Sequence, residues 1–149
     1  MCCTDLKEEL GGSIECYSNS NVASENGKQF RIEKPNNVEL CKVQIDGCLI
    51  QNQAVDKCDY LFKICQSNQI FLVELKGTDV IHAVNQITST YDQIRNKIDE
   101  PPINYKGFII SSSVPRAAEQ NFRKQQEKVL KQKGFLIKKG HQKHVEKIN

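Results

Sequence analysis

The chain has 149 residues, of which 38% are hydrophobic and 26% are charged, and its formal net charge is +3. This composition is typical of one soluble globular domain, and it excludes fibrous and largely disordered proteins. No window approaches the roughly 18 consecutive apolar residues of a membrane span, and the N-terminus lacks the basic and apolar regions of a signal peptide. We therefore expect a cytoplasmic protein with no membrane partner.

The predicted elements form a single domain over residues 1–149, with a core at 28–139 between a weakly ordered segment at 1–27 and a basic tail at 140–149. Apolar residues recur at helical spacing at positions 80, 84, 87, 91, 94 and 98, which makes the helix at 79–98 the clearest element. The predicted helices are residues 4–10, 79–98 and 116–133, and the predicted strands are 28–33, 38–46, 57–65, 69–76, 105–111 and 135–137.

This order of elements predicts an α/β fold with a mixed β-sheet and flanking helices around one hydrophobic core. The strands at 57–65 and 69–76 are separated by only three residues, so they should form an antiparallel hairpin. After residue 76 the strands alternate with helices, which predicts parallel pairing in the C-terminal half of the sheet.

Seven cysteines occur, at positions 2, 3, 16, 41, 48, 58 and 65. An odd number without a CxxC pair argues against a closed disulfide framework. Four of them fall in apolar, strand-like segments, where a free thiol behaves as a small hydrophobic side chain. We therefore expect reduced, buried cysteines. A zinc site is the alternative, although the intervals of 7, 10 and 7 residues between these four do not form short ligand loops.

Positive charge is concentrated at the C-terminal end of the chain. Residues 123–149 contain nine Lys or Arg and two Asp or Glu, a net charge of +7. Such a segment is a candidate polyanion contact, and a solvated helix face is the alternative. The candidate nucleic-acid-binding residues are Arg123, Lys124, Lys128, Lys131, Lys138 and Lys139.

The strand predicted at 69–76 is apolar except for Glu74 and Lys76. Because side chains alternate along a strand, these two share one face with Leu72, and Val73 and Leu75 take the other. A strand that is apolar on both faces should lie inside a covered sheet, where ionised groups are costly unless they are paired or used. The two residues are therefore either functional or a structural ion pair.

Antiparallel pairing of the hairpin would bring Asp59 beside Glu74 and Lys76. Two carboxylates are suitable ligands for Mg²⁺, which polarises a phosphate and lowers the pKa of a bound water. A lysine ammonium can orient that water or stabilise the developing negative charge. These residue types in this arrangement point to phosphodiester hydrolysis.

Asp59, then Glu74-Leu75-Lys76 across a hairpin, then an amphipathic helix and a strand, resembles the PD-(D/E)XK nuclease superfamily. The resemblance covers residues 38–112 and extends to 139. It implies a restriction-endonuclease-like core in the order helix, three antiparallel strands, helix, strand (αβββαβ). It also implies that Asp59 and Glu74 bind Mg²⁺, for which Mn²⁺ substitutes, that the Leu75 carbonyl completes the metal shell, and that Lys76 is catalytic.

The chain departs from the superfamily pattern in three features: the residue before Asp59, the Gln/Tyr motif and the acid of the first helix. Cys58 stands where the motif has a proline, and Gln86 and Tyr91 are spaced too widely for the Gln/Tyr motif of some members. His141 and His144 fall in the predicted tail and receive no catalytic role. The acid that many members carry on the first helix has three candidates here, Glu8, Glu9 and Glu15.

The sequence thus predicts a small Mg²⁺-dependent endonuclease that acts on DNA, in a restriction, resolvase or defence role. Asp59, Glu74 and Lys76 are its predicted catalytic residues. A homodimer or a subunit of a larger complex is expected, because one small core spans little of a duplex. The alternative is an inactive module of the same fold that binds nucleic acid or a protein.

Overall fold

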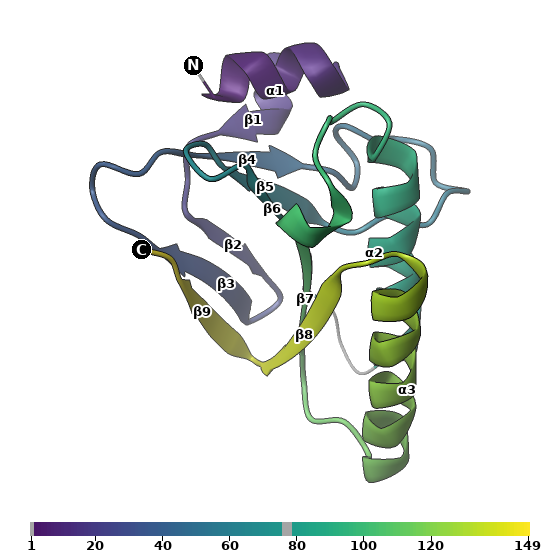
Figure 1. The fold of residues 1–149 in the computed structure, drawn as a ribbon. Coiled ribbons are helices and arrows are strands. Elements are labelled where there is room, and N and C mark those ends of the chain that lie inside the picture. Colours follow the sequence, from purple (N-terminus) through teal and green to yellow (C-terminus); the bar gives the residue numbers. More distant parts are fainter. Residues whose placement is uncertain (1, 76–78) are drawn as a thin grey trace.

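The computed structural model describes residues 2–75 and 79–149 and has a mixed α/β architecture with two β-sheets (Figure 1). The larger sheet has six strands in the order β1-β4-β5-β6-β7-β8, and the smaller has three in the order β2-β3-β9. The strands of the larger sheet are β1 Tyr17–Ser18, β4 Leu40–Gln44, β5 Tyr60–Ile64, β6 Gln69–Leu75, β7 Tyr105–Ser111 and β8 Leu136–His141. Those of the smaller sheet are β2 Val22–Glu25, β3 Lys28–Glu33 and β9 Lys143–Lys147.

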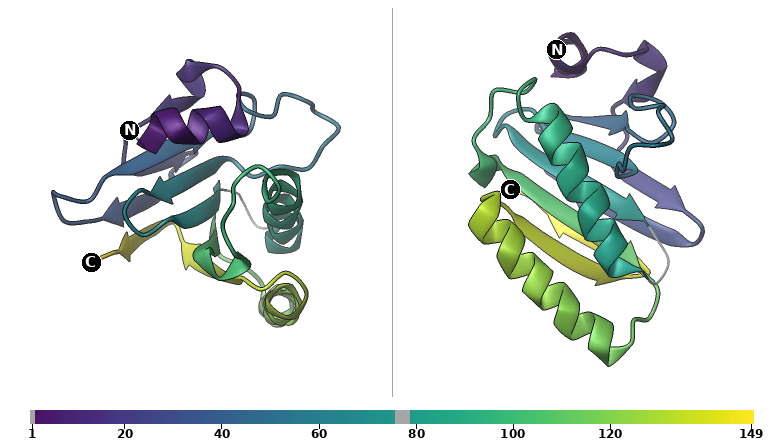
Figure 2. Two further views of the ribbon diagram at one scale, coloured as in Figure 1. Left: turned by 45° about the horizontal axis from the view of Figure 1, so that its top comes forward. Right: turned by 90° about the vertical axis from the view of Figure 1, so that its right-hand side faces the viewer.

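Three α-helices lie on one face of the six-stranded sheet. They are α1 Cys2–Leu10, α2 Val80–Ile94 and α3 Arg116–Gln132, and short 3-10 turns occur at Ile14–Cys16 and Pro102–Asn104. Figure 2 shows α2 and α3 side by side across the strands, with α1 over the end of the sheet that contains β1 and β4. The side chain of Asp79 caps α2 by accepting a hydrogen bond from the His82 amide.

The predicted hairpin and the change from antiparallel to parallel pairing are confirmed. β4, β5 and β6 pair antiparallel, whereas β6 with β7 and β7 with β8 pair parallel. The turn between β5 and β6 places Asn68 at a φ of 57°, a left-handed conformation that asparagine tolerates. The helices α2 and α3 and the strand β7 also form close to their predicted bounds.

The prediction of one hydrophobic core was wrong, because the six-stranded sheet is covered on both faces by different layers. The helices cover one face, where Ile70 and Leu72 of β6 belong to the first cluster of buried residues. The smaller sheet covers the other, where Val73 of β6 packs with Phe30 of β3 in the second cluster. The alternation predicted for the central strand is therefore confirmed, but its second face is covered by strands rather than by helices.

The predicted basic tail is also not a tail, because residues 143–147 form β9. This strand pairs parallel with β3, and Phe30 lies opposite His144. The imidazole of His144 stacks on the Phe30 ring with centroids 5.9 Å apart, and its Nε2 lies 3.1 Å from Glu146. Glu146 in turn lies 3.6 Å from the ammonium of Lys106 on β7. The inward-facing side chains of β9 are thus polar, and the pattern of an apolar strand is missing from its sequence.

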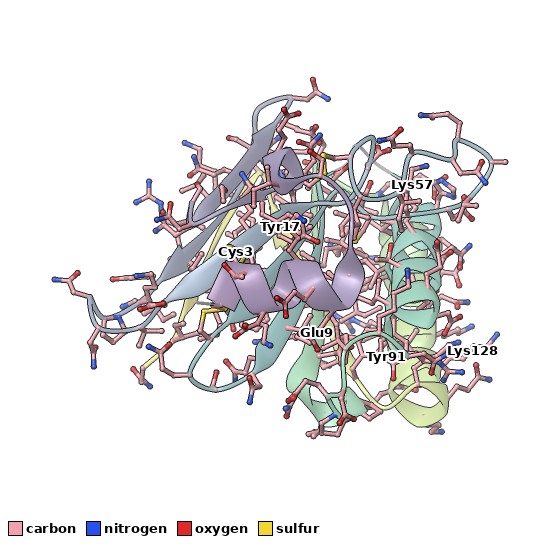
Figure 3. All side chains as sticks on the ribbon, turned by 90° about the horizontal axis from the view of Figure 1, so that it is seen from above. Cys3, Glu9, Tyr17, Lys57, Tyr91 and Lys128 are labelled. Carbon is pink, nitrogen blue, oxygen red and sulfur yellow. A yellow bond between two sulfur atoms is a disulfide. The ribbon has the colours of Figure 1, made fainter. Side chains whose placement is uncertain are left out.

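The prediction of reduced cysteines was wrong as well. Three disulfides occur, Cys2–Cys65, Cys3–Cys41 and Cys16–Cys48, while Cys58 remains a buried thiol. They fasten α1 and the turn after it to β4, to the end of β5 and to the turn at 45–50. Figure 3 labels Cys3 on α1, where this helix crosses the strands. Within the segment 1–27, for which the polar sequence predicts weak order, residues 2–18 thus form α1, a 3-10 turn and β1, and three disulfides join them to the rest of the chain.

The parallel strands β6, β7 and β8 end at the same edge of the large sheet. Leu75 pairs with Ile110, and Ser111 pairs with His141. In open sheets with parallel strands, the carboxyl ends of the strands are where ligands commonly bind.

Within the described ranges, no helix is long and apolar enough to cross a membrane.

Candidate active site

Asp59 stands just before β5 and lies beside the end of β6, the strand that carries Glu74, as the hairpin predicts. The antiparallel register of β5 and β6 pairs Tyr60 with Val73, which are the chain neighbours of Asp59 and Glu74. The Asp59 amide donates to the Val73 carbonyl over 3.1 Å, and the amide of Leu75 donates to Asp59 Oδ2 over 2.9 Å. The aspartate is therefore held by β6 through both its main chain and its carboxylate.

Both carboxylates are removed from bulk water. Glu74 is 0% exposed and Asp59 is 8% exposed. Glu74 occupies the position in β6 that shares a face with Leu72, so its side chain lies in the layer between the sheet and the helices. The Leu75 side chain packs in the opposite layer. Charged groups persist in such surroundings when they are paired or bind a cation.

The pKa of the buried Cys58 thiol is affected by the two acids of this site. Burial raises the pKa of the Cys58 thiol, and the nearby carboxylates of Glu74 and Asp59 raise it further. A hydrogen bond with Thr90 acts in the opposite direction on the same pKa. Both predicted metal ligands therefore lie close to one buried atom. The thiol itself stays protonated at neutral pH and is inert as a nucleophile.

Lys76, the third member of the predicted motif, lies outside the described residues. Within those ranges, no group of three or more His, Cys, Asp and Glu residues has an arrangement suited to a metal. Asp59 and Glu74 provide hard oxygen atoms on adjacent strands, which fits Mg²⁺, a cation that keeps several waters and takes one or two carboxylates. The remaining positions would be filled by water, by substrate oxygens and by a main-chain carbonyl.

Of the three candidate acids near the N-terminus, Glu9 lies at the wrong end of the sheet. Its carboxylate is 3.9 Å from the ammonium of Lys63. Lys63 lies near the C-terminal end of β5, whereas Asp59 precedes the N-terminal end of this strand. The charge of Glu9 also contributes, after burial and other neighbours, to the raised pKa of Tyr105. Tyr105 pairs with Ile70 at the start of β6, and Glu74 lies near the end of that strand. Glu8 and Glu15 are exposed.

Two polar residues of α2, Gln86 and Thr90, lie buried against the site, and neither was predicted from the sequence to have a role. Gln86 is 6% exposed and Thr90 is 0% exposed. The Cys58 amide donates to Thr90 Oγ1 over 2.8 Å, and Gln86 Nε2 donates to the Lys57 carbonyl over 3.2 Å. Their spacing of four residues places both on one side of α2 next to the apolar stripe, but this spacing alone does not show that their partners are buried.

The predicted nucleic-acid-binding residues divide into two groups. Arg123, Lys124, Lys128 and Lys131 are exposed on α3. Lys124, Lys128 and Lys131 line a shallow hollow together with Glu127 and Gln132. Figure 3 shows Lys128 on the outer side of α3, directed away from the sheet. This side of the helix carries positive charge to the surface.

The other two, Lys138 and Lys139, are half-buried on β8. The ammonium of Lys139 is paired with the Glu119 carboxylate and lies 5.9 Å from the centre of the Phe122 ring. The hydrogen bond from Lys139 lowers the pKa of Glu119. Lys139 therefore joins β8 to α3, and a phosphate contact by this residue would have to replace these interactions.

Comparisons with protein-family models, with curated proteins and with solved structures found no match to this chain. Its membership of the PD-(D/E)XK superfamily thus stays a prediction that rests on the residues themselves.

Proposed function

We propose that this protein is a small Mg²⁺-dependent nuclease that hydrolyses phosphodiester bonds in DNA. The observation that supports the proposal is the hydrogen bond from the Leu75 amide to Asp59, which holds this buried acid beside the strand that carries the buried Glu74. A wholly buried glutamate beside a second acid is a costly arrangement for stability alone. Binding of a divalent cation would offset that cost.

The order of the elements supports the same proposal. The first helix α1, the antiparallel strands β4, β5 and β6, the crossover helix α2 and the parallel strand β7 follow the αβββαβ order expected of a restriction-endonuclease-like core. β1 to β3 are inserted between the first helix and this meander. The candidate site lies on the second and third strands of the meander, where that core is expected to place its acids.

Each residue of the proposed site has a distinct role. Asp59 and Glu74 would hold the cation, with the Leu75 carbonyl as a third ligand. A bound Mg²⁺ supplies a Lewis acid and a water of lowered pKa. Lys76 follows Leu75 directly in the chain, and its ammonium would orient the attacking water and stabilise charge on the phosphate. Exposed Arg and Lys side chains of α3 would contact the phosphate backbone.

A cleavage assay tests the proposal with labelled duplex DNA and, in parallel, with RNA of the same sequence. Mg²⁺ should support cleavage of DNA, and chelation should abolish it. Glu74→Gln and Lys76→Ala should each reduce the rate by about 100-fold or more, because each removes a charge that acts on the reacting groups. Glu25→Gln, an exposed acid on β2, is the matched control. Undiminished activity in both site variants would overturn the assignment.

The alternative is an inactive module that binds nucleic acid through α3, which the exposed charge of that helix favours. It predicts binding that weakens with salt and no metal-dependent cleavage. Deletion of residues 134–149 is unsuitable as a test, since it removes both β8 and β9 from their sheets. Substitution of exposed lysines leaves both sheets intact.

The location and the assembly state remain predictions. Disulfides persist in oxidising compartments and are rare in the cytoplasm, so the three bridges are in tension with the predicted cytoplasmic location. A homodimer would present two sites to the two strands of a duplex. Sedimentation of the purified protein with and without DNA measures whether two copies associate.

A further inference from the structure

Three polar side chains on successive turns of α2 hold the main chain just before Asp59. Gln93 Nε2 donates to the Asp56 carbonyl over 3.2 Å, and Gln86 Nε2 donates to the Lys57 carbonyl over 3.2 Å. Thr90 Oγ1 accepts a hydrogen bond of 2.8 Å from the Cys58 amide. We call Gln86, Thr90 and Gln93 the α2 latch. It contacts three consecutive residues of the chain at the point where they lead into the candidate site.

Within the α2 latch, Thr90 is buried, and its hydroxyl group acts both as a hydrogen-bond donor and as an acceptor. This side chain is 0% exposed, and its hydroxyl donates to the Gln86 carbonyl over 2.9 Å while accepting from Cys58. A hydroxyl that donates and accepts at once has little freedom to rotate, and the β-branched side chain restricts it further. Loss of one partner would leave a buried amide unsatisfied, which costs about 1–3 kcal/mol.

The segment held by the α2 latch, residues 56–58, leads directly into Asp59 and so determines the direction from which the main chain reaches it. On its other side, Asp59 is bound to β6 through the Val73 carbonyl and the Leu75 amide. Its own carbonyl accepts hydrogen bonds from the amides of Ile45 and Asp46. The helix therefore fixes the approach of the chain through residue 58, and the neighbouring strands fix Asp59 itself.

We propose that Thr90 and Gln86 are positioning residues that set the Asp59 carboxylate in the geometry for a divalent cation. This inference rests on the proposed function, since it concerns the same metal site. Groups behind a metal ligand commonly contribute about 10- to 100-fold to metal affinity, because a ligand displaced by a fraction of an ångström binds poorly. The α2 latch acts on Asp59 through the backbone of Cys58 and touches no reacting atom.

The competing explanation is that Thr90 only packs α2 against the sheet. Thr90→Val keeps the shape of the side chain and removes the hydroxyl, whereas Thr90→Ser keeps the hydroxyl and removes a methyl group. Thr88→Val is the matched control on the same helix, because among the described residues the Thr88 hydroxyl bonds within α2, to the Asn85 carbonyl. Packing alone predicts that the serine variant is at least as impaired as the valine variant.

The experiment is a calorimetric titration of the full chain with Mn²⁺, together with hydrogen exchange of the Cys58 amide. Thr90→Val should weaken Mn²⁺ binding about tenfold or more and speed exchange at Cys58, while Thr90→Ser and Thr88→Val stay near wild type. Should Thr90→Val not fold, Gln86→Met carries the test, since it keeps the length of the side chain and loses the donor to Lys57.

The outcomes separate the two proposals. Wild-type protein that binds no Mn²⁺ overturns the proposed metal-dependent function itself. Wild-type protein that binds Mn²⁺, with unchanged affinity in Thr90→Val and Gln86→Met, overturns the positioning role and leaves the function standing. Weakened binding in these variants with rescue by Thr90→Ser supports both.

Discussion

The amide of Leu75 donates a hydrogen bond of 2.9 Å to the carboxylate of Asp59, so one strand of the hairpin holds the acid of the other. The donor is part of a buried main chain, and the acceptor is 8% exposed. This bond joins the two halves of the candidate site before any cation is bound. Asp59 therefore contributes to the stability of the hairpin as well as having a proposed catalytic role, and the two contributions can be tested separately.

Substitutions of Asp59 should therefore differ in stability but not in activity. Asp59→Ala leaves the Leu75 amide without its acceptor and should lower the free energy of unfolding by about 1–3 kcal/mol. Asp59→Asn keeps an oxygen that can accept the bond, so its loss should be smaller. Both should reduce Mg²⁺-dependent cleavage by about 100-fold or more, since both remove the charge. Urea titration and rate measurements check this, and equal stability of the two variants would contradict it.

The disulfides predict a particular count of reactive thiols. Alkylation of unfolded protein without a reductant should modify one cysteine, Cys58, and after reduction it should modify all seven. Mass spectrometry distinguishes the two results. Modification of all seven without reduction would instead support the reduced state predicted from the sequence.

Reduction should also destabilise the fold. The bridges span 63, 38 and 32 residues, and a disulfide closing a loop of such length typically contributes about 2–4 kcal/mol. Thermal unfolding with and without a dithiol reductant measures the loss. The far-ultraviolet spectrum at low temperature is the control, because it shows whether the reduced chain is still folded before heating.

The pKa of Cys58 predicts a pH dependence of stability. Burial holds this pKa above its ordinary value of 9.0 in the folded protein, so the unfolded chain loses the proton first as the pH rises. The contribution is fully present below pH 9 and is lost above it, by about 1.4 kcal/mol for each pH unit until the folded pKa is reached. Unfolding in urea between pH 8 and pH 10 measures this slope. Cys58→Ala should show a shallower slope, and identical slopes would contradict the assignment.

Charge on α3 predicts the salt dependence of DNA binding. Lys124→Gln and Lys128→Gln should each weaken binding and reduce the slope of log affinity against log salt by about 0.9. Lys133→Gln is the matched control, because the Lys133 ammonium lies 2.8 Å from the Asp92 carboxylate and is already paired. Binding in filter or fluorescence assays at several salt concentrations gives the slopes. An effect of Lys133→Gln as large as the others would count against a specific phosphate contact.

The central elements were predictable because their signals are local. The predicted strand at 69–76 has an apolar run with two charged interruptions, and the predicted helix at 79–98 has a continuous apolar stripe, so the type and order of these elements follow from side-chain periodicity. The position of Asp59 beside the end of β6 followed from the short hairpin. The positions of Gln86 and Thr90 did not, because polar residues beside an apolar stripe do not reveal whether their partners are water or a buried main chain.

The two ends of the chain were not predictable for a different reason. β9 pairs with β3 more than 100 residues earlier, and its inward side chains include His144 and Glu146, so neither distance nor hydrophobicity signals a strand. The helix α1 is mostly polar and is secured by Cys2 and Cys3. Which thiols meet depends on the folded positions of β4 and β5, and the intervals between cysteines contain no such information.

The bridge between Cys2 and Cys65 has a consequence for a nicked chain. Residues 51–56 form a largely exposed segment between the two cysteines. A single proteolytic cut in this segment would leave two fragments that remain covalently joined and that share the strands of the large sheet. The nicked protein should migrate as one species in a denaturing gel without reductant and as two with it. Protease resistance judged only on non-reducing gels would therefore overstate how well this segment is protected.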